Sequence, residues 1–124
     1  MIKGICLGDI ALDCKDAQKL QNFYVELLGW EKLTIYGCPA VRSDHSVVFL
    51  FMCADDFDYI QPVWPEQPGK QQKQVHIDFQ VDDLPAAVKQ AEDIGAVKAE
   101  NQYGGDEWVT MFDPEGHPFC LCKK

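Results

Sequence analysis

The chain repeats itself, and this internal repeat constrains its fold more than any other feature of the sequence. The segment from Asp9 reads DIALDCKDAQKLQNFYVELLGW, and the segment from His76 reads HIDFQVDDLPAAVKQAEDIGAV. At a shift of 67 residues, Asp9 aligns with His76 and Asp16 aligns with Asp83. A repeat of this kind predicts two copies of one supersecondary unit.

Each copy begins with a segment that alternates between apolar and polar residues, which is typical of a strand with one face in a core. The apolar positions are Ile10, Leu12 and Cys14 in the first copy and Val75, Ile77, Phe79 and Val81 in the second. An apolar stripe at helical spacing follows in each copy. Asp16 and Asp83 are the expected N-caps, and Gly29 and Gly95 are the expected C-caps.

Short strand-like runs follow each expected helix, at 30–36, 39–42 and 46–53 and again at 97–102, 107–112 and 118–122. The sequence therefore predicts an α+β fold with the order βαβββ twice. We expect a single domain over residues 1–124, with half-modules at about 4–53 and 74–123. Residues 54–73, rich in Pro, Gln and Asp, are expected to form the linker.

Composition narrows the class of function. The formal net charge is −9, with 47% hydrophobic and 25% charged residues. Such a surface repels phosphate backbones and anionic lipid, so we expect neither a nucleic-acid partner nor a membrane partner. The first sixteen residues already contain Asp9 and Asp13, which is unlike a signal peptide. We therefore expect a cytoplasmic protein.

The chain has six cysteines: Cys6, Cys14, Cys38, Cys53, Cys120 and Cys122. An even number is compatible with a disulfide framework in a short secreted chain. Most of these residues, however, lie in apolar, strand-like runs, where cysteine behaves as a small hydrophobe. Reduced thiols in a cytoplasm are the favoured interpretation.

Three strings carry a resemblance to a known family: LDCKDAQKLQNFYVELLGWE, VWPEQPGKQQKQVHIDFQVDDLPAAVKQAEDIGA and WVTMFDPEGHPFCLC. Their order resembles the vicinal oxygen chelate superfamily, which includes glyoxalase I, bleomycin-resistance proteins and extradiol dioxygenases. The chain is most similar to its small bacterial glyoxalase-like domain proteins. The resemblance implies two tandem βαβββ modules that form a curved mixed sheet around a central cavity. It also implies a homodimer.

Metal-dependent members of this superfamily hold a metal with four ligands, commonly His or Gln with Glu. The resemblance places the corresponding positions on Asp9, His76 and Cys120, while the run 46–53 offers no His, Glu, Gln or Asp. Asp9, His76 and Cys120, with Cys53 as a further thiol, are chemically acceptable zinc ligands. Because the pattern departs from the family so widely, we expect no bound metal and no other cofactor.

His76 and Asp9 are the candidate catalytic residues, because a carboxylate can orient an imidazole and make it a general base. Asp78, Cys120, Trp108 and Phe51 are the candidate substrate-binding residues, since ligand pockets combine apolar walls with a few polar groups. The alternatives are that residues 74, 76, 78 and 80 face only water, and that the aromatic and cysteine side chains fill the core. We interpret His45 and His117 as surface residues.

Three functions remain open from the sequence. The favoured hypothesis is a small-molecule-binding glyoxalase-like protein with an incomplete metal site, with or without enzymatic activity of its own. The alternative is a metal-dependent lyase or dioxygenase of the vicinal oxygen chelate type. The third is a structural role, in which side chains of the protein itself fill the cavity.

Overall fold

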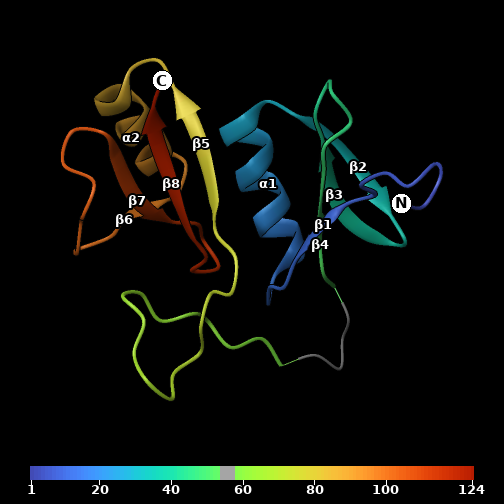
Figure 1. Ribbon diagram of the computed structural model, residues 1–124, viewed down its shortest axis with the longest axis horizontal. Coiled ribbons are helices and arrows are strands. Elements are labelled where there is room, and N and C mark those ends of the chain that lie inside the picture. The colour runs from blue at the N-terminus through green and yellow to red at the C-terminus, as the bar shows by residue number, and fades with distance from the viewer. Residues whose placement is uncertain (54–57) are drawn as a thin grey trace. The chain divides into compact units, whose positions relative to one another are not determined.

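The computed structural model describes residues 1–53 and 58–124 of the chain. The chain divides into two compact units, Met1–Tyr59 and Ile60–Lys124, and each unit contains one copy of the repeat (Figure 1). The boundary falls inside the expected linker, whose first residues, 54–57, lie outside the described residues. A single domain over residues 1–124 stays a prediction.

The first unit has one helix and a four-stranded mixed sheet. Its elements are β1 (Ile10–Leu12), α1 (Ala17–Leu28), β2 (Glu31–Ile35), β3 (Cys38–Arg42) and β4 (Val48–Phe51). The strand order is β1-β4-β3-β2, with β1 parallel to β4 and the other neighbours antiparallel. The parallel pair is possible because α1 and two strands intervene between β1 and β4.

The second unit repeats this topology. Its elements are β5 (Ile77–Val81), α2 (Leu84–Asp93), β6 (Val97–Lys98), β7 (Trp108–Phe112) and β8 (Pro118–Lys123). The order is β5-β8-β7-β6, with β5 parallel to β8. The predicted α+β fold of two tandem βαβββ modules is therefore confirmed.

The ends of both helices follow the sequence prediction. Asp16 accepts the amide hydrogen of Lys19 at 3.0 Å, and Gly29, with φ of 67°, ends α1 as a left-handed cap. Asp83 caps α2 in the same way. At the end of α2 the C-cap residue is Ile94, and Gly95 follows it with a positive φ of 113°. The amide of Ala96 then donates back to the Ala91 carbonyl at 2.9 Å, so Gly95 supplies the turn that the sequence predicts at this helix end.

Phe51 lies in the core of the first unit. Its ring is fully buried and stacks on Tyr24 of α1, with ring centroids 5.6 Å apart. Gln21, also on α1 and buried, donates to the carbonyls of Leu33 and Ala40 at 2.9 Å each. The helix is thus held to the sheet by aromatic packing and by a buried amide whose hydrogen bonds offset its desolvation.

The strand expected at 97–102 is shorter than predicted and ends at Lys98. The side chain of Gln102 takes over the pairing with β7, because its amide donates to the carbonyls of Ala99 and Thr110 and accepts from the Thr110 amide. A side chain that satisfies the backbone groups of β7 removes the need for further ladder bonds at this edge.

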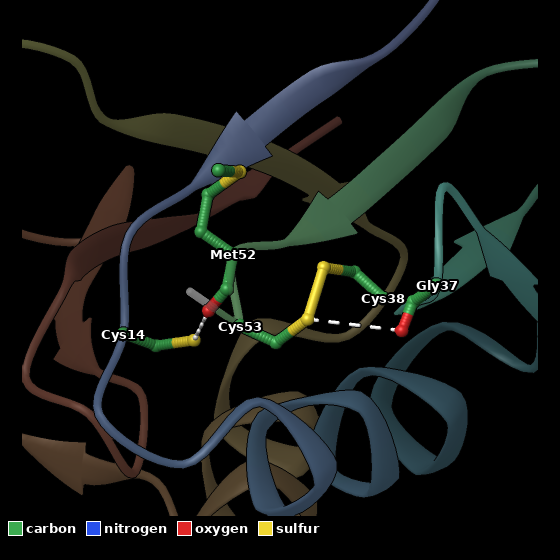
Figure 2. The surroundings of a disulfide bond; sticks show 5 residues. All are labelled: Cys14, Gly37, Cys38, Met52 and Cys53. Atoms are coloured by element: carbon green, nitrogen blue, oxygen red, sulfur yellow. Dashed lines mark hydrogen bonds between the residues drawn. A yellow bond between two sulfur atoms is a disulfide. The ribbon is translucent and has the colours of Figure 1, made fainter. Parts of the chain in front are cut away.

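One pair of cysteines corrects the expectation of reduced thiols. Cys38 at the start of β3 and Cys53 just after β4 form a disulfide, shown in Figure 2. The nearby thiol of Cys14 instead donates to the carbonyl of Met52 at 3.2 Å. Because β3 and β4 are antiparallel neighbours, residues 38 and 53 meet at the same end of the sheet. Cys53 is therefore also removed from the candidate metal ligands.

The described part of the expected linker folds onto the second unit. The amide of Val63 donates to the Gln71 carbonyl at 2.9 Å. The ring of Trp64 lies edge-on to Tyr103, and the ammonium of Lys73 sits 4.6 Å from the centre of the Trp64 ring. Aromatic and cation–π contacts thus hold this part of the expected linker against the second unit, and its role as the linker between the half-modules stays a prediction. Within the described residues, no helix is long and apolar enough to cross a membrane.

Candidate functional site

The register of the second sheet brings polar side chains into rows across β5, β8 and β7. Asp78 pairs with Cys120, and Cys120 pairs with Thr110. Two residues further along β8, Cys122 pairs with Gln80 and with Trp108. Side chains two residues apart share a face of a strand, so both rows lie on one face.

The opposite face of the same sheet is apolar. Ile77, Phe79 and Val81 alternate with the polar residues of β5 and are half-buried, and the Phe79 ring lies against Phe119 of β8. This alternation confirms the period-two prediction for residues 77–81. One face of this sheet carries Asp78, Cys120, Thr110, Trp108 and Cys122, and we call it the polar face of the second sheet.

A compact cluster of possible ligand atoms lies at one end of this face. One donor atom each from His76, Asp78 and Cys120 lies within 4.8 Å of the others. The Nε2 atom of His76 is 3.3 Å from a carboxylate oxygen of Asp78. His76 and Asp78 are exposed, whereas Cys120 is buried. The structure thus brings together three of the residues singled out from the sequence.

The thiol of Cys120 is electrostatically disfavoured as a thiolate. Burial is the main cause that raises the pKa of Cys120 above its usual value of 9.0, and the nearby Asp78 charge adds to the rise. A hydrogen bond with the hydroxyl of Thr110, at 3.4 Å between Oγ1 and Sγ, acts in the opposite direction. The pKa of Cys122 is also raised, first by burial and then by Asp78 and Cys120. At neutral pH both side chains are therefore neutral thiols.

We expect Cys120 to be alkylated far more slowly than Cys6 at pH 7.5, because Cys120 is buried with a raised pKa and Cys6 is exposed. Peptide mass spectrometry after timed iodoacetamide treatment measures both rates.

The raised pKa of the folded Cys120 thiol also stabilises the fold below pH 9, and this contribution is lost as the pH rises through the shifted value. Cys120→Ala should lessen the alkaline loss of stability. Equal alkylation rates at pH 7.5 would contradict the assignment.

One residue of the expected linker, Lys73, approaches this cluster. The Lys73 ammonium pairs with Glu66 and lies over the Trp64 ring, and its charge acts to lower the pKa of Cys120. Among the residues that the structure describes, Lys73 therefore brings a positive charge close to Cys120. Sequence reasoning missed it because residues 54–73 were interpreted as a linker. Thr110 was missed because the pairing register of two strands cannot be deduced from their alternation alone.

The other predicted site residues lie elsewhere. Asp9 is half-buried just before β1, in the first unit, so its pairing with His76 stays a prediction. Phe51 is fully buried against α1 and presents no surface to a ligand, so we assign it to the core. Trp108 retains 40% of its surface and lies on the polar face of the second sheet.

The prediction that His117 is a surface residue is wrong. Its ring nitrogen Nδ1 lies 2.7 Å from the fully buried carboxylate of Asp113. The same carboxylate accepts the amide hydrogens of Glu115 and His117. A buried aspartate needs such partners, and here it organises the turn between β7 and β8. His45, by contrast, is exposed.

Comparisons with known proteins agree with this architecture. Residues 9–122 match a family model described as a glyoxalase-like domain. No curated protein matches the chain. Because the family model spans nearly the whole chain, it covers both units and all the candidate residues above.

Solved structures show the same fold at low sequence identity. A glyoxalase/bleomycin resistance protein/dioxygenase family enzyme from Burkholderia phytofirmans PsJN is 14% identical, with a TM-score of 0.66 over 94% of this chain and 96% of that chain. TnmS3, an antibiotic binding protein from Streptomyces sp. CB03234, is 16% identical, with a TM-score of 0.62 over 99% and 98%. The fosfomycin resistance protein FosX from Mesorhizobium loti is 11% identical, with a TM-score of 0.62 over 98% and 92%.

The internal repeat, the sheet topology and the match to the family model all lead to the same family assignment. The two βαβββ modules have the strand orders described above, and the family model spans both of them. The chain belongs to the glyoxalase-like domain family of the vicinal oxygen chelate superfamily.

Proposed function

We propose that the chain binds a small molecule on the polar face of the second sheet. The observation that carries this proposal is the cluster of His76, Asp78 and Cys120, whose donor atoms lie within 4.8 Å. The half-exposed indole of Trp108 adds an apolar surface on the same face. Ligand sites generally combine apolar and aromatic walls with a few converging polar groups. TnmS3 and FosX, named for antibiotic binding and fosfomycin resistance, share this fold.

The charges of the site favour some ligands over others. Asp78 contributes a carboxylate, and Cys120 stays neutral because its pKa is raised. The positive charge of Lys73, which reaches the cluster, is offset by its ion pair with Glu66. The chain as a whole carries a net charge of −9. We therefore propose a planar ligand that is neutral or cationic, stacked on Trp108 and hydrogen-bonded to His76 and Asp78. A cation over an indole ring gains further attraction from the ring quadrupole.

If the site is catalytic, His76 acts as the general base. Asp78, 3.3 Å from its Nε2 atom, orients the ring in the free protein. Asp9 keeps its proposed role as a second carboxylate for the same imidazole. The thiol of Cys120 is not proposed as a nucleophile, since a buried thiol with a raised pKa forms little thiolate.

Three probes of one shape test the ligand preference: benzamidine is a planar cation, benzamide is neutral and benzoate is an anion. We expect benzamidine and benzamide to raise the melting temperature of the protein, because a ligand that binds only the folded state stabilises it. Benzoate should have little effect. Trp108→Ala and Asp78→Asn should remove the benzamidine response, while His45→Ala, an exposed change in the first unit, should retain it. A response to benzoate equal to that of benzamidine would contradict the proposal.

The same cluster supports a second candidate, a metal-dependent lyase or dioxygenase. His76, Asp78 and Cys120 offer nitrogen, oxygen and sulfur donors, and zinc accepts all three types with a fourth position left open. When bound, zinc would supply a Lewis acid that polarises a substrate oxygen. Within the second unit Asp78 joins His76 and Cys120, and Asp9 of the first unit, implied by the resemblance, stays a proposed ligand.

Elemental analysis decides between the two candidates. We expect protein purified without added metal to contain far less than one zinc, iron, nickel or manganese ion per chain. The reason is that His76 and Asp78 are exposed and already paired with each other, so a metal must displace that contact. About one ion per chain, lost in His76→Ala and kept in His45→Ala, would establish the metal-dependent candidate instead.

We also propose that the protein is a homodimer in the cytoplasm. Closed symmetric dimers are the commonest oligomers, and sedimentation should give twice the chain mass of 14.0 kDa. The support for the cytoplasm is that Cys6, Cys14, Cys120 and Cys122 form no disulfide, although Cys38 and Cys53 do. A monomer mass at tens of micromolar protein would contradict the dimer.

A further inference from the structure

A groove lies on the other side of the second sheet, toward α2. It has a volume of about 690 Å³. Its lining includes the buried apolar residues Leu84 and Val88 of α2 and the partly buried Val109 of β7, which we call its floor. Val109 follows Trp108 in β7, and Lys123 at the groove follows Cys122 in β8. Since consecutive residues of a strand point to opposite faces, this groove is separate from the polar face described above.

The rim of the groove carries free charges of both signs. Lys98 of β6, Lys123 of β8 and Asp106 of the preceding loop line it. Within the residues that the structure describes, none of these three has an ion-pair or hydrogen-bond partner for its charged group. The other carboxylates of the rim are engaged: Asp82 pairs with Lys124 at 3.1 Å, and Asp83 caps α2.

We propose that this groove binds a small zwitterion with an apolar body, such as an α-amino acid with an apolar side chain or a short apolar peptide. The ligand carboxylate interacts with both Lys98 and Lys123, and its ammonium interacts with Asp106. Its apolar side chain covers the floor formed by Leu84, Val88 and Val109. The volume lies within the range of small-molecule sites, about 300–1,000 Å³.

Charge complementarity selects this class over simpler ions. An anion without a positive group leaves Asp106 unpaired and approaches a chain with a net charge of −9. A cation without a negative group leaves two lysine ammonium groups without a partner. Only a ligand with both charges satisfies the rim on both sides, and burial of an apolar side chain supplies the remaining affinity.

The groove is tested by NMR titration of the ¹⁵N-labelled chain with L-leucine and with L-leucyl-L-leucine. The two probes separate a free amino acid from a peptide as the source of the zwitterion. We expect at least one of them to cause saturable shifts of the Val88, Lys98 and Val109 amides. N-acetyl-L-leucine lacks the ammonium and L-leucinamide lacks the carboxylate, so both should bind more weakly. Equal binding of either analogue, or no saturable shift with either probe, would overturn the proposal.

Substitutions test the rim. Lys98→Gln, Lys123→Gln and Asp106→Asn should each weaken binding about two- to fivefold, the range expected for exposed ion pairs. Lys89→Gln is the matched control, because Lys89 is also an exposed lysine but pairs with Asp93 on α2, away from the groove. Val109→Thr, which keeps the shape of the floor but adds a hydroxyl, should also weaken binding. If Lys89→Gln weakens binding as much as Lys98→Gln, the rim is not specific and the proposal fails.

Discussion

Phe51→Ala is expected to lower the free energy of unfolding by about 3–5 kcal/mol, the usual cost of removing a large buried ring. The ring is fully buried and stacks on Tyr24 of α1. Its removal leaves a cavity between β4 and α1, and the lost contacts are not replaced by solvent. The loss is a large part of the 5–15 kcal/mol typical of a whole domain.

Trp108→Ala is the contrasting variant. Trp108 retains 40% of its surface, so its removal should cost much less stability than the loss of Phe51. For ligand binding we expect the reverse: Trp108→Ala should lose the rise in melting temperature with benzamidine. Phe51→Leu, a milder variant that keeps an apolar side chain in the core, should retain it. Urea denaturation followed by circular dichroism gives the stabilities. A Phe51→Ala loss below 1 kcal/mol, or a lost ligand response in Phe51→Leu, would return this residue to the site.

The difference between Phe51 and Trp108 shows what the sequence can predict about the site. Both lie in strand-like runs, and alternation alone predicts only that neighbouring residues face opposite sides. Which face of the first sheet packs against α1 depends on the tertiary contact between Tyr24 and Phe51. The local sequence pattern does not predict this contact. The second module was easier, because charged residues at 76 and 78 mark the side that is not packed on α2.

The fold was more predictable than the site. Both aspartate caps, the βαβββ order and the strand positions follow from periodicity and turn chemistry, which act over a few residues. Gln102 and Lys73 were not predictable, since each acts through partners that only the folded chain brings near. The Cys38–Cys53 bridge is a similar case, because the apolar context of these residues indicated core cysteines and gave no sign that 38 and 53 meet.

Loss of the Cys38–Cys53 disulfide is expected to lower the free energy of unfolding by about 3 kcal/mol, because a bridge that closes a loop of about 15 residues restricts the unfolded chain by roughly this amount. The sequence separation of the two cysteines is 15. The double variant Cys38→Ser/Cys53→Ser should show this loss in urea denaturation without reductant. Cys6→Ser, a change at an exposed free thiol, is the control and should stay close to the unsubstituted chain.

Reductant and thiol counting give independent readouts of the bridge. With dithiothreitol, the unsubstituted chain should unfold at the same urea concentration as the double variant. Without reductant, the denatured chain should expose the four free thiols Cys6, Cys14, Cys120 and Cys122 to a thiol reagent, out of six cysteines in the sequence. Six reactive thiols in the oxidised sample, or a denaturation curve that reductant leaves unchanged, would show that the bridge does not form.

The stabilisation also predicts how the fold shifts the redox balance of the pair. If the disulfide makes folding more favourable by about 3 kcal/mol, folding must make disulfide formation from the two thiols more favourable by the same amount than it is in the unfolded chain, because the four states form a closed thermodynamic cycle. For a two-electron couple this corresponds to a midpoint lower by about 60 mV in the native chain than in the urea-unfolded chain. Equilibration in glutathione buffers, followed by alkylation and mass spectrometry, measures both midpoints. A native midpoint below the glutathione potential of a reducing compartment means that the bridge would persist there, whereas a midpoint above it means that the chain would carry six thiols there. Equal midpoints in the native and unfolded chains would show that the fold does not favour the bridge.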